Sequence, residues 1–255
     1  MKSRIFGVIA LCGVSLMGAV SAQGQTVSSL DDIVIWAGTG SNEMGFVFAW
    51  NDPSSSANLA TLAWGYRWSG SATGADALTA ILATDPRLFG RLDSATGSGI
   101  SVFGFGYDAN DNGSFGVTGA EDPLGASVSL SFVNGISDTN INSSLTDPPF
   151  SSAGAGPSDS GDYYIEGWFD NGFWELTEAS GPGYPMTWGT PSSFGLSTLS
   201  LVNDSWLALS NSNNAFGSIA VGSAVAAIPE PSTAVLVISG FSLLLLLRRR
   251  PCPSH

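Results

Sequence analysis

The segment YDANDNGSFG, residues 107–116, carries oxygen-bearing side chains at the spacing of a cation-binding loop. Asp108, Asn110 and Asn112 occupy alternate positions before Gly113. Their oxygens can converge on a hard cation as the loop wraps around it, and the glycine permits the sharp bend that such a loop needs. These residues therefore predict a calcium site.

The sequence places the closing ligand of this site in an unusual position. Calcium loops with this spacing carry a bidentate glutamate at their twelfth position, which here is Gly119. Glu121 or Asp122 would have to complete the coordination from an altered path, and the affinity would then be weak. The alternative interpretation is an Asx-rich turn between two strands that binds no ion.

Eight tryptophans suggest a second kind of site, because a flat aromatic ring can stack on the face of a sugar. Trp64 and Trp68 share one face of an expected strand, however, and burial of both rings in the core is the favoured alternative. A carbohydrate-binding module is therefore the second functional interpretation. The candidate sugar-binding residues are Trp64, Trp68, Trp168 and Trp174.

Acidic residues near position 170 raise the question of glycosidase chemistry. A glycosidase needs two carboxyl groups roughly 5 to 10 Å apart across a cleft, and Glu166 and Glu175 are candidates for such a pair. Accidental pairs are common in an acidic protein, so catalysis is the third interpretation and not the preferred one. Residues 23–228 contain no histidine or cysteine, which excludes Ser-His-Asp and Cys-His catalysis and the usual zinc ligands.

The amino terminus has the build of a secretory signal peptide. Lys2 and Arg4 precede an apolar stretch over residues 5–19, and small residues follow up to Ala22. A charged start, an apolar middle and a small-residue exit in this order predict cleavage after Ala22. We therefore expect residues 1–22 to be removed and the protein to be exported by the general export machinery.

A second apolar run, residues 234–247, lies near the carboxyl terminus. Its 14 residues would cover about 21 Å as a helix, less than the roughly 30 Å of a hydrocarbon core. We predict a marginal membrane-spanning helix within residues 228–250. The basic cluster that follows the run should stay in the cytoplasm with residues 251–255, so that the body lies outside the inner membrane.

Three features of this tail occur together: a Pro-Glu-Pro start, the apolar run and a basic end. The residues on either side of the run are Pro229, Glu230, Pro231, Arg248, Arg249 and Arg250. The combination resembles the PEP-CTERM sorting signal of exported bacterial proteins. This resemblance implies an exosortase-type enzyme that acts on the tail and releases the protein or attaches it at the surface, commonly beside exopolysaccharide. An uncleaved single-span anchor is the alternative.

Residues 23–227 form one acidic domain in this interpretation. Three arginines stand against 20 acidic residues there, which gives a formal charge of −17. Such a surface repels phosphate backbones, and we expect no nucleic acid binding. An acidic surface also keeps an exported protein soluble without any specific partner.

The pattern of apolar residues predicts mainly β-structure. Residues 127–133, SVSLSFV, alternate between serine and apolar side chains almost throughout, which is typical of a strand with one buried face. Asn171-Gly172 favours a type I′ turn, and the segments on either side of it should pair as a hairpin. The expected architecture is an antiparallel β-sandwich-like domain.

One helical excursion is expected within residues 75–92. Leu78, Ile81 and Leu82 form a helical stripe, and Pro86 should end the first helix just before it. Arg87 and Arg91 would then lie on a second short turn. Taken together, the sequence favours an exported surface or extracellular-matrix protein with a structural or adhesive role over an enzyme.

Overall fold

The computed structural model describes residues 25–50, 61–96, 99–122, 126–139, 155–167, 173–190, 192, 195–212 and 221–228. Within these ranges the chain is built mainly of strands, with one α-helix after the third strand. The elements are η1 (Leu30–Asp32), β1 (Trp36–Gly38), β2 (Asn42–Ala49), β3 (Thr61–Trp68), α1 (Gly74–Thr84), β4 (Leu88–Thr96), β5 (Gly99–Tyr107), β6 (Val117–Thr118), β7 (Ile136–Asp138), β8 (Gly156–Pro157), β9 (Tyr163–Glu166), β10 (Phe173–Ser180), β11 (Ser205–Ser212) and β12 (Ala224–Ala226).

Six of the described strands form the first sheet, in the order β1-β3-β2-β11-β10, with β12 added beside β3. β2 and β3 pair antiparallel, as do β10 and β11. β11 runs parallel to β2, and both β1 and β12 run parallel to β3. The expectation of an antiparallel fold is therefore wrong: the sheets are mixed. The chain leaves the first sheet after β3, builds the helix and the second sheet, and returns to the first sheet at β10; β11 then runs beside β2 in the same direction.

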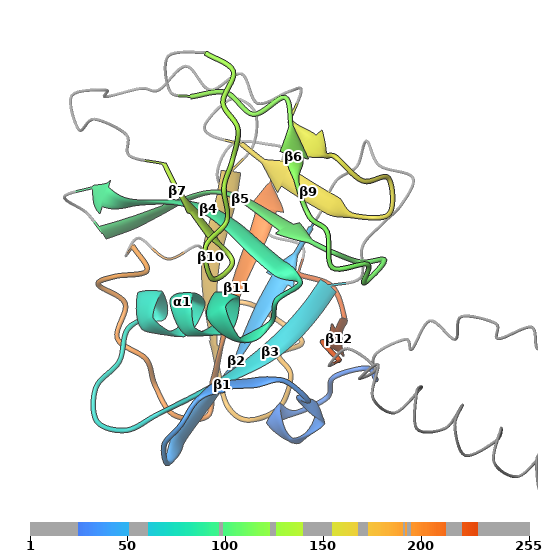
Figure 1. Cartoon of the computed structure of the whole chain (residues 1–255). Helices are drawn as coiled ribbons and strands as arrows, with labels where there is room; N and C mark the ends of the chain where they lie inside the picture. The colour runs from blue at the N-terminus through green and yellow to red at the C-terminus, as the bar shows by residue number, and fades with distance from the viewer. Residues whose placement is uncertain are drawn as a thin grey trace, which may run out of the picture.

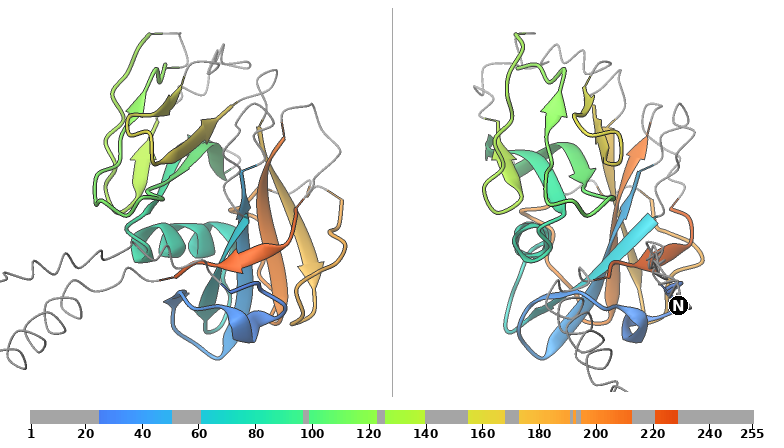
Figure 2. Two further views of the ribbon diagram at one scale, coloured as in Figure 1. Left: turned by 90° about the vertical axis from the view of Figure 1, so that its right-hand side faces the viewer. Right: turned by 45° about the vertical axis from the view of Figure 1, so that its right-hand side comes forward.

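The second sheet has the order β7-β4-β5-β9, and β6 and β8 form a separate two-stranded sheet. The second sheet lies above the first in Figure 1, and α1 lies in the corner between the two sheets (Figure 2). Phe105 of β5 packs edge-on against Phe48 of β2 and Trp174 of β10, with ring centroids 4.7 and 4.8 Å apart. Both sheets and the helix thus share one core. The prediction of a mainly β body with one helix is confirmed for the described residues.

α1 ends just before Pro86, as the sequence predicts, and begins one residue ahead of the expected range. The Thr73 hydroxyl accepts a hydrogen bond from the Asp76 main-chain N–H, and the Asp76 carboxylate accepts one from the Thr73 N–H at 2.8 Å. This capping box fixes the start of the helix. The helix ends at Thr84, two residues before Pro86, because a proline disfavours helical backbone at the residue that precedes it. The second half of the predicted excursion is wrong. Residues 88–92 belong to β4, because their side chains alternate between the core and the opposite face, where Arg91 lies.

Residues 127–133 are not a strand of either main sheet. The serines are exposed and the apolar side chains at 128, 130 and 132 are half-buried, which is the alternation that the sequence predicts. Among the described pairings, Ser127 forms a single bridge with Glu121, and Val133 forms one with Ile136. Alternation determines which side chains face the body. A ladder also needs a neighbouring strand, which the pattern of one segment does not specify.

Asn171 and Gly172 lie outside the described residues, but the strands on either side of them contradict the predicted hairpin. β9 pairs with β5 in the second sheet, whereas β10 pairs with β11 in the first. The ladder of β10 with β11 joins eight residue pairs, so that long-range pairing prevails over the local turn preference. The chain therefore crosses from one sheet to the other in this region.

The first and last described segments lie side by side. Thr26 forms an antiparallel bridge with Val225 of β12, and β12 in turn pairs with β3. The predicted signal peptide and the tail from Pro229 onward, including the run 234–247, lie outside the described residues. No helix within the described ranges has both the length and the apolar character required to cross a membrane.

Candidate functional site

The predicted cation loop follows β5 directly, and its side chains organise its own backbone. The Asp108 carboxylate accepts hydrogen bonds from the main-chain N–H of Gly113 at 2.9 Å and of Asn112 at 3.3 Å. Asn110 Oδ1 accepts from the same Asn112 N–H at 3.1 Å. Asp111 and Gly113 have left-handed φ angles of 55° and 73°, which complete the bend. The loop thus has the Asx-rich geometry that its composition favours.

A second segment, residues 159–162, packs against this loop. Asn112 Nδ2 donates a hydrogen bond of 2.6 Å to Asp159 Oδ2, while Asp159 Oδ1 accepts from the Gly161 N–H at 3.0 Å. A Cβ atom on Gly161 would lie 2.2 Å from Nδ2 of Asn110, so glycine is needed for the close approach. Residues 159–162 were not among the predicted site residues. Their only signal in the sequence is the run Asp-Ser-Gly-Asp, which is equally typical of a Pro/Gly/Ser-rich loop.

Asp162 brings a third carboxylate to this place. Asp162 is only 6% exposed, and neither of its side-chain oxygens has a hydrogen-bond donor among the described residues. Burial raises the pKa of Asp162 to about 6, and the negative charges of Asp108 and Asp159 add to the rise. The Ala109 main-chain N–H lies near the carboxylate and partly offsets this rise in pKa, although it forms no hydrogen bond with Asp162. Asp108 itself is 2% exposed, so that two buried carboxyl groups face one another.

The predicted closing ligands, Glu121 and Asp122, make their hydrogen bonds outside the loop 108–113. Asp122 Oδ1 accepts a hydrogen bond from the Ala126 N–H at 2.8 Å, and the Glu121 main-chain oxygen accepts one from Arg91. The acids that approach Asp108 are instead Asp159 and Asp162. The chain returns to the loop 47 residues after Asn112, so the acidic segment beside the loop differs from the one that the sequence suggests. Across the described ranges, no three His, Cys, Asp or Glu side chains already have the arrangement of a metal site.

The candidate sugar-binding tryptophans are core residues wherever the structure describes them. Trp64 is fully buried, and Trp68 and Trp174 are 5% and 6% exposed. The Trp64 indole N–H donates a hydrogen bond of 3.0 Å to Asp85 Oδ2. None of these three rings presents a face on which a sugar could stack, so the packing alternative is correct for them. Trp168 lies outside the described residues.

The two glutamates considered as a catalytic pair lie in different sheets. Glu166 ends β9, where Arg91 Nη1 lies 2.9 Å from its Oε2 and the Tyr164 hydroxyl donates to the same oxygen. Burial raises the pKa of Tyr164 well above its ordinary value, and the adjacent Glu166 carboxylate adds to this rise. Glu175 is buried on β10 of the first sheet. Both side chains are buried, on strands of different sheets, and neither lines the pocket described below, so they do not support the glycosidase interpretation.

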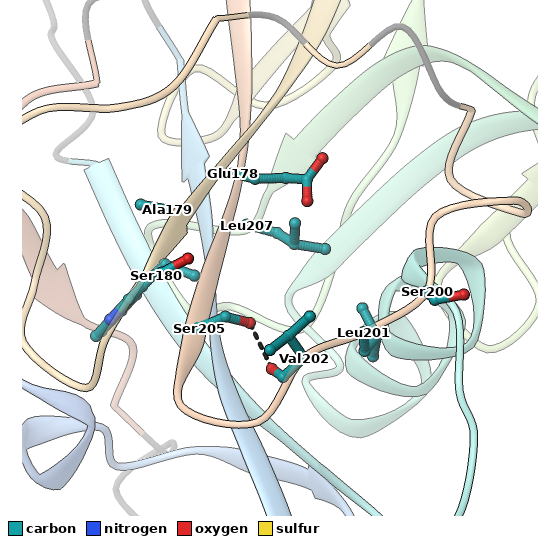
Figure 3. A pocket seen from close by; sticks show the side chains of 9 residues that line it. Glu178, Ala179, Ser180, Ser200, Leu201, Val202, Ser205 and Leu207 are labelled. Carbon is teal, nitrogen blue, oxygen red and sulfur yellow. Dashed lines mark hydrogen bonds between the residues drawn. The ribbon is translucent and has the colours of Figure 1, made fainter.

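A small surface pocket lies where β10 and β11 meet the segment 200–202 (Figure 3). Glu178 supplies the one carboxylate of its lining, and the Ser205 hydroxyl donates a hydrogen bond of 2.6 Å to the Val202 main-chain oxygen. The lining residues are Glu178, Ala179, Ser180, Ser200, Leu201, Val202, Ser205, Trp206 and Leu207. A single carboxylate among small and apolar side chains supplies neither an acid–base pair nor a set of metal ligands.

Comparison with known proteins gave no match of any kind. No family model, no curated protein and no solved structure resembles this chain significantly.

Proposed function

We propose that the protein is an exported component of the cell surface or extracellular matrix with a structural or adhesive role, sorted through its carboxyl-terminal tail. The signal peptide, the Pro-Glu-Pro tail and the acidic body support this proposal from the sequence side. Its partners would be the export machinery, an exosortase-type sorting enzyme and the inner membrane, with exopolysaccharide as a neighbour at the surface.

The observation that supports the proposal most is how the body ends. The Val27 N–H donates to the Ala224 oxygen and the Ala226 N–H donates to the Gln25 oxygen, both at 2.9 Å. The Ala227 N–H donates to the Ala63 oxygen at 3.0 Å. Residues just after the predicted signal peptide are thus joined to residues just before the predicted sorting signal. Loss of both predicted signals would remove no part of this paired body.

A buried ion pair holds the last described residue. Arg87 forms two hydrogen bonds of 3.1 Å with the Asp85 carboxylate, and Arg87 Nη2 also donates to the Ile228 main-chain oxygen. Both charged residues are nearly inaccessible to solvent. The folded body therefore extends up to Ile228, and Pro229 is the next residue. An enzyme that cuts a native chain needs an extended, accessible substrate, which favours sites from Pro229 onward.

A structural or adhesive role is preferred to catalysis because of what the acidic residues do. Glu166 neutralises Arg91, Asp85 neutralises Arg87, and Glu43 pairs with Arg67. These side chains contribute to the architecture. The exported part also has no histidine or cysteine to serve as a nucleophile or base.

The test is the intact mass of the protein recovered from fractions of the cells that produce it. We expect a species that lacks residues 1–22 and a carboxyl-terminal piece beginning at or after Pro229, found outside the cytoplasm. A matched variant with Arg248, Arg249 and Arg250 changed to alanine should accumulate with its tail uncut. Full-length chain dissolved in the cytosol, trimmed at neither end, would overturn the proposal.

A further inference from the structure

Two buried carboxylates, Asp108 and Asp162, form no ion pair with any basic side chain in the described part of the chain. Asp162 and Asp108 are 6% and 2% exposed, and their segments are in direct contact, because Asn112 donates a hydrogen bond to Asp159 and Gly161 lies against Asn110. The Asp108 carboxylate accepts hydrogen bonds from two main-chain N–H groups, whereas no donor in the described ranges reaches either side-chain oxygen of Asp162. A buried ionised carboxylate without a partner is costly, so this place requires a positive charge that none of the described residues supplies.

The surroundings of this pair contain further oxygen atoms and an opening to solvent. Asn110 and Asn112 are exposed at the rim, and Asp159 is half-buried beside them. Amide, carboxylate and main-chain oxygens are the ligands that hard cations take. The two carboxyl groups at the bottom of the site are therefore anionic and buried, while the asparagines at its rim are polar and exposed.

We propose that a calcium ion binds between Asp108 and Asp162, with side-chain oxygens of Asn110 and Asp159 as further ligands. The ion replaces the missing donor at Asp162 and balances two buried negative charges with its own two positive charges. Because no three acidic side chains already converge in the described structure, the rim side chains must rotate inward around the ion. Calcium fits this better than magnesium, since it accepts six to eight oxygen ligands in flexible geometry whereas magnesium demands a near-ideal octahedron.

The ligand set differs from the one that a linear calcium loop would use. The loop 108–113 forms one side of the site. Residues 159–162, which directly precede β9, form the other side. The ion would therefore join the ends of two neighbouring strands, β5 and β9. A site of this kind reinforces the second sheet and does not depend on the sorting of the chain.

The experiment is a thermal melt of the full chain in detergent, first in chelator and then in excess calcium chloride. We expect the midpoint to rise by roughly 3–6 °C at ten times the dissociation constant, as ligand linkage predicts for a body of this size. Magnesium chloride at the same concentration should give a much smaller shift. Terbium, excited through neighbouring tyrosines, should give a saturable luminescence that calcium displaces.

Two variants separate an ion site from ordinary structure. Asp162→Asn should melt higher than the wild type in chelator, because a buried charge is removed, and should lose the calcium response. Asp31→Asn removes the same charge from an exposed position on η1 and should keep the full response. If Asp162→Asn does not fold, Asn110→Ala at the rim should still weaken terbium binding several-fold.

The outcomes are distinguishable. A calcium-dependent midpoint and displaceable terbium in the wild type, both lost in Asp162→Asn, support the site. If the wild type gives no calcium shift and no saturable terbium signal, the two carboxyl groups share a proton and the proposal is wrong. An equal calcium response in Asp162→Asn and in the wild type would also overturn it, because the ion would then bind elsewhere.

Discussion

The two ends of β9 bury an acidic side chain in opposite ways. Glu166, the last residue of β9, meets the Arg91 guanidinium at 2.9 Å and accepts from the Tyr164 hydroxyl. Asp162, just before β9, meets another carboxyl group and receives no hydrogen bond. Both acids are at least nine-tenths buried. A buried acid with its cation in place belongs to the architecture, whereas a buried acid without one indicates a ligand or a proton.

The largest expected loss of stability comes from removing Arg91, the cation that pairs with Glu166 at the end of β9. Arg91→Met leaves Glu166 buried without its partner and should lower the free energy of unfolding by about 3–5 kcal/mol. Urea denaturation followed by tryptophan fluorescence measures this loss. The control is the double variant Arg91→Met/Glu166→Gln, which should regain at least half of the loss because the orphaned charge is gone. Equal stability of the single and double variants would show that Arg91 acts by packing alone.

Arg87 and Arg67 allow a comparison of the stability that a buried ion pair and an exposed ion pair contribute. Arg87→Met leaves Asp85 with the Trp64 indole as a donor and frees the Ile228 oxygen, and it should cost about 3 kcal/mol. Arg67→Met breaks the Glu43 pair, whose side chains are 43% and 33% exposed, and should cost less than about 1 kcal/mol.

Limited proteolysis provides a second readout for Arg87. In the wild type, cuts near the carboxyl end should begin at or after Pro229. In Arg87→Met, cuts should also appear within residues 224–228, since the last segment is no longer held. An unchanged cleavage pattern would argue that β12 pairing alone secures this end of the body.

The sequence was a good guide where local chemistry decides the structure. Thr73, Asp76 and Pro86 mark the start and end of α1, and each acts within a few residues of itself in the chain. The burial of Trp64 and Trp68 followed from their shared strand face. These features needed no knowledge of what the rest of the chain does.

Long-range pairing decides the features that the sequence could not predict. Residues 127–133 have the alternation of a strand but no ladder along most of their length, because no partner strand lies beside them in the described structure. Asn171-Gly172 has the chemistry of a hairpin turn, yet β10 pairs with a strand some 30 residues further along.

The candidate site shows the same division. The spacing of Asp108, Asn110 and Asn112 predicts a tight oxygen-rich loop, and that loop is present. Asp159 and Asp162 reach it only because β9 pairs with β5, which brings the two segments together. No local pattern around Asp108 contains that information, so nearness in sequence could point only to Glu121 and Asp122.

The packing of the two loops should matter moderately. Gly161→Ala would place a Cβ within 2.8 Å of the Asn110 Cβ and Cγ atoms and should cost about 1–2 kcal/mol, because the loops must move apart. Gly156→Ala on β8 is the control, since a Cβ added there would have no atom within 4 Å and should change stability by less than about 0.5 kcal/mol. Urea titration compares the two. Equal effects would mean that the loops are not closely packed at Gly161.

The smallest expected loss of stability is at Asn112, which lies exposed at the rim of the proposed ion site. Asn112→Ala removes the 2.6 Å hydrogen bond to Asp159 and the 2.8 Å bond that Asn112 Oδ1 accepts from the Ser114 N–H. Both are exposed, so the loss in chelator should be about 0.5–1 kcal/mol. Asn203→Ala, which removes an exposed bond to the Glu43 N–H, should cost a similar amount and leave the calcium response unchanged. A calcium shift that falls in Asn112→Ala but not in Asn203→Ala would tie the rim to the ion. Equal shifts would mean that Asn112 holds the two loops together without influencing what binds between them.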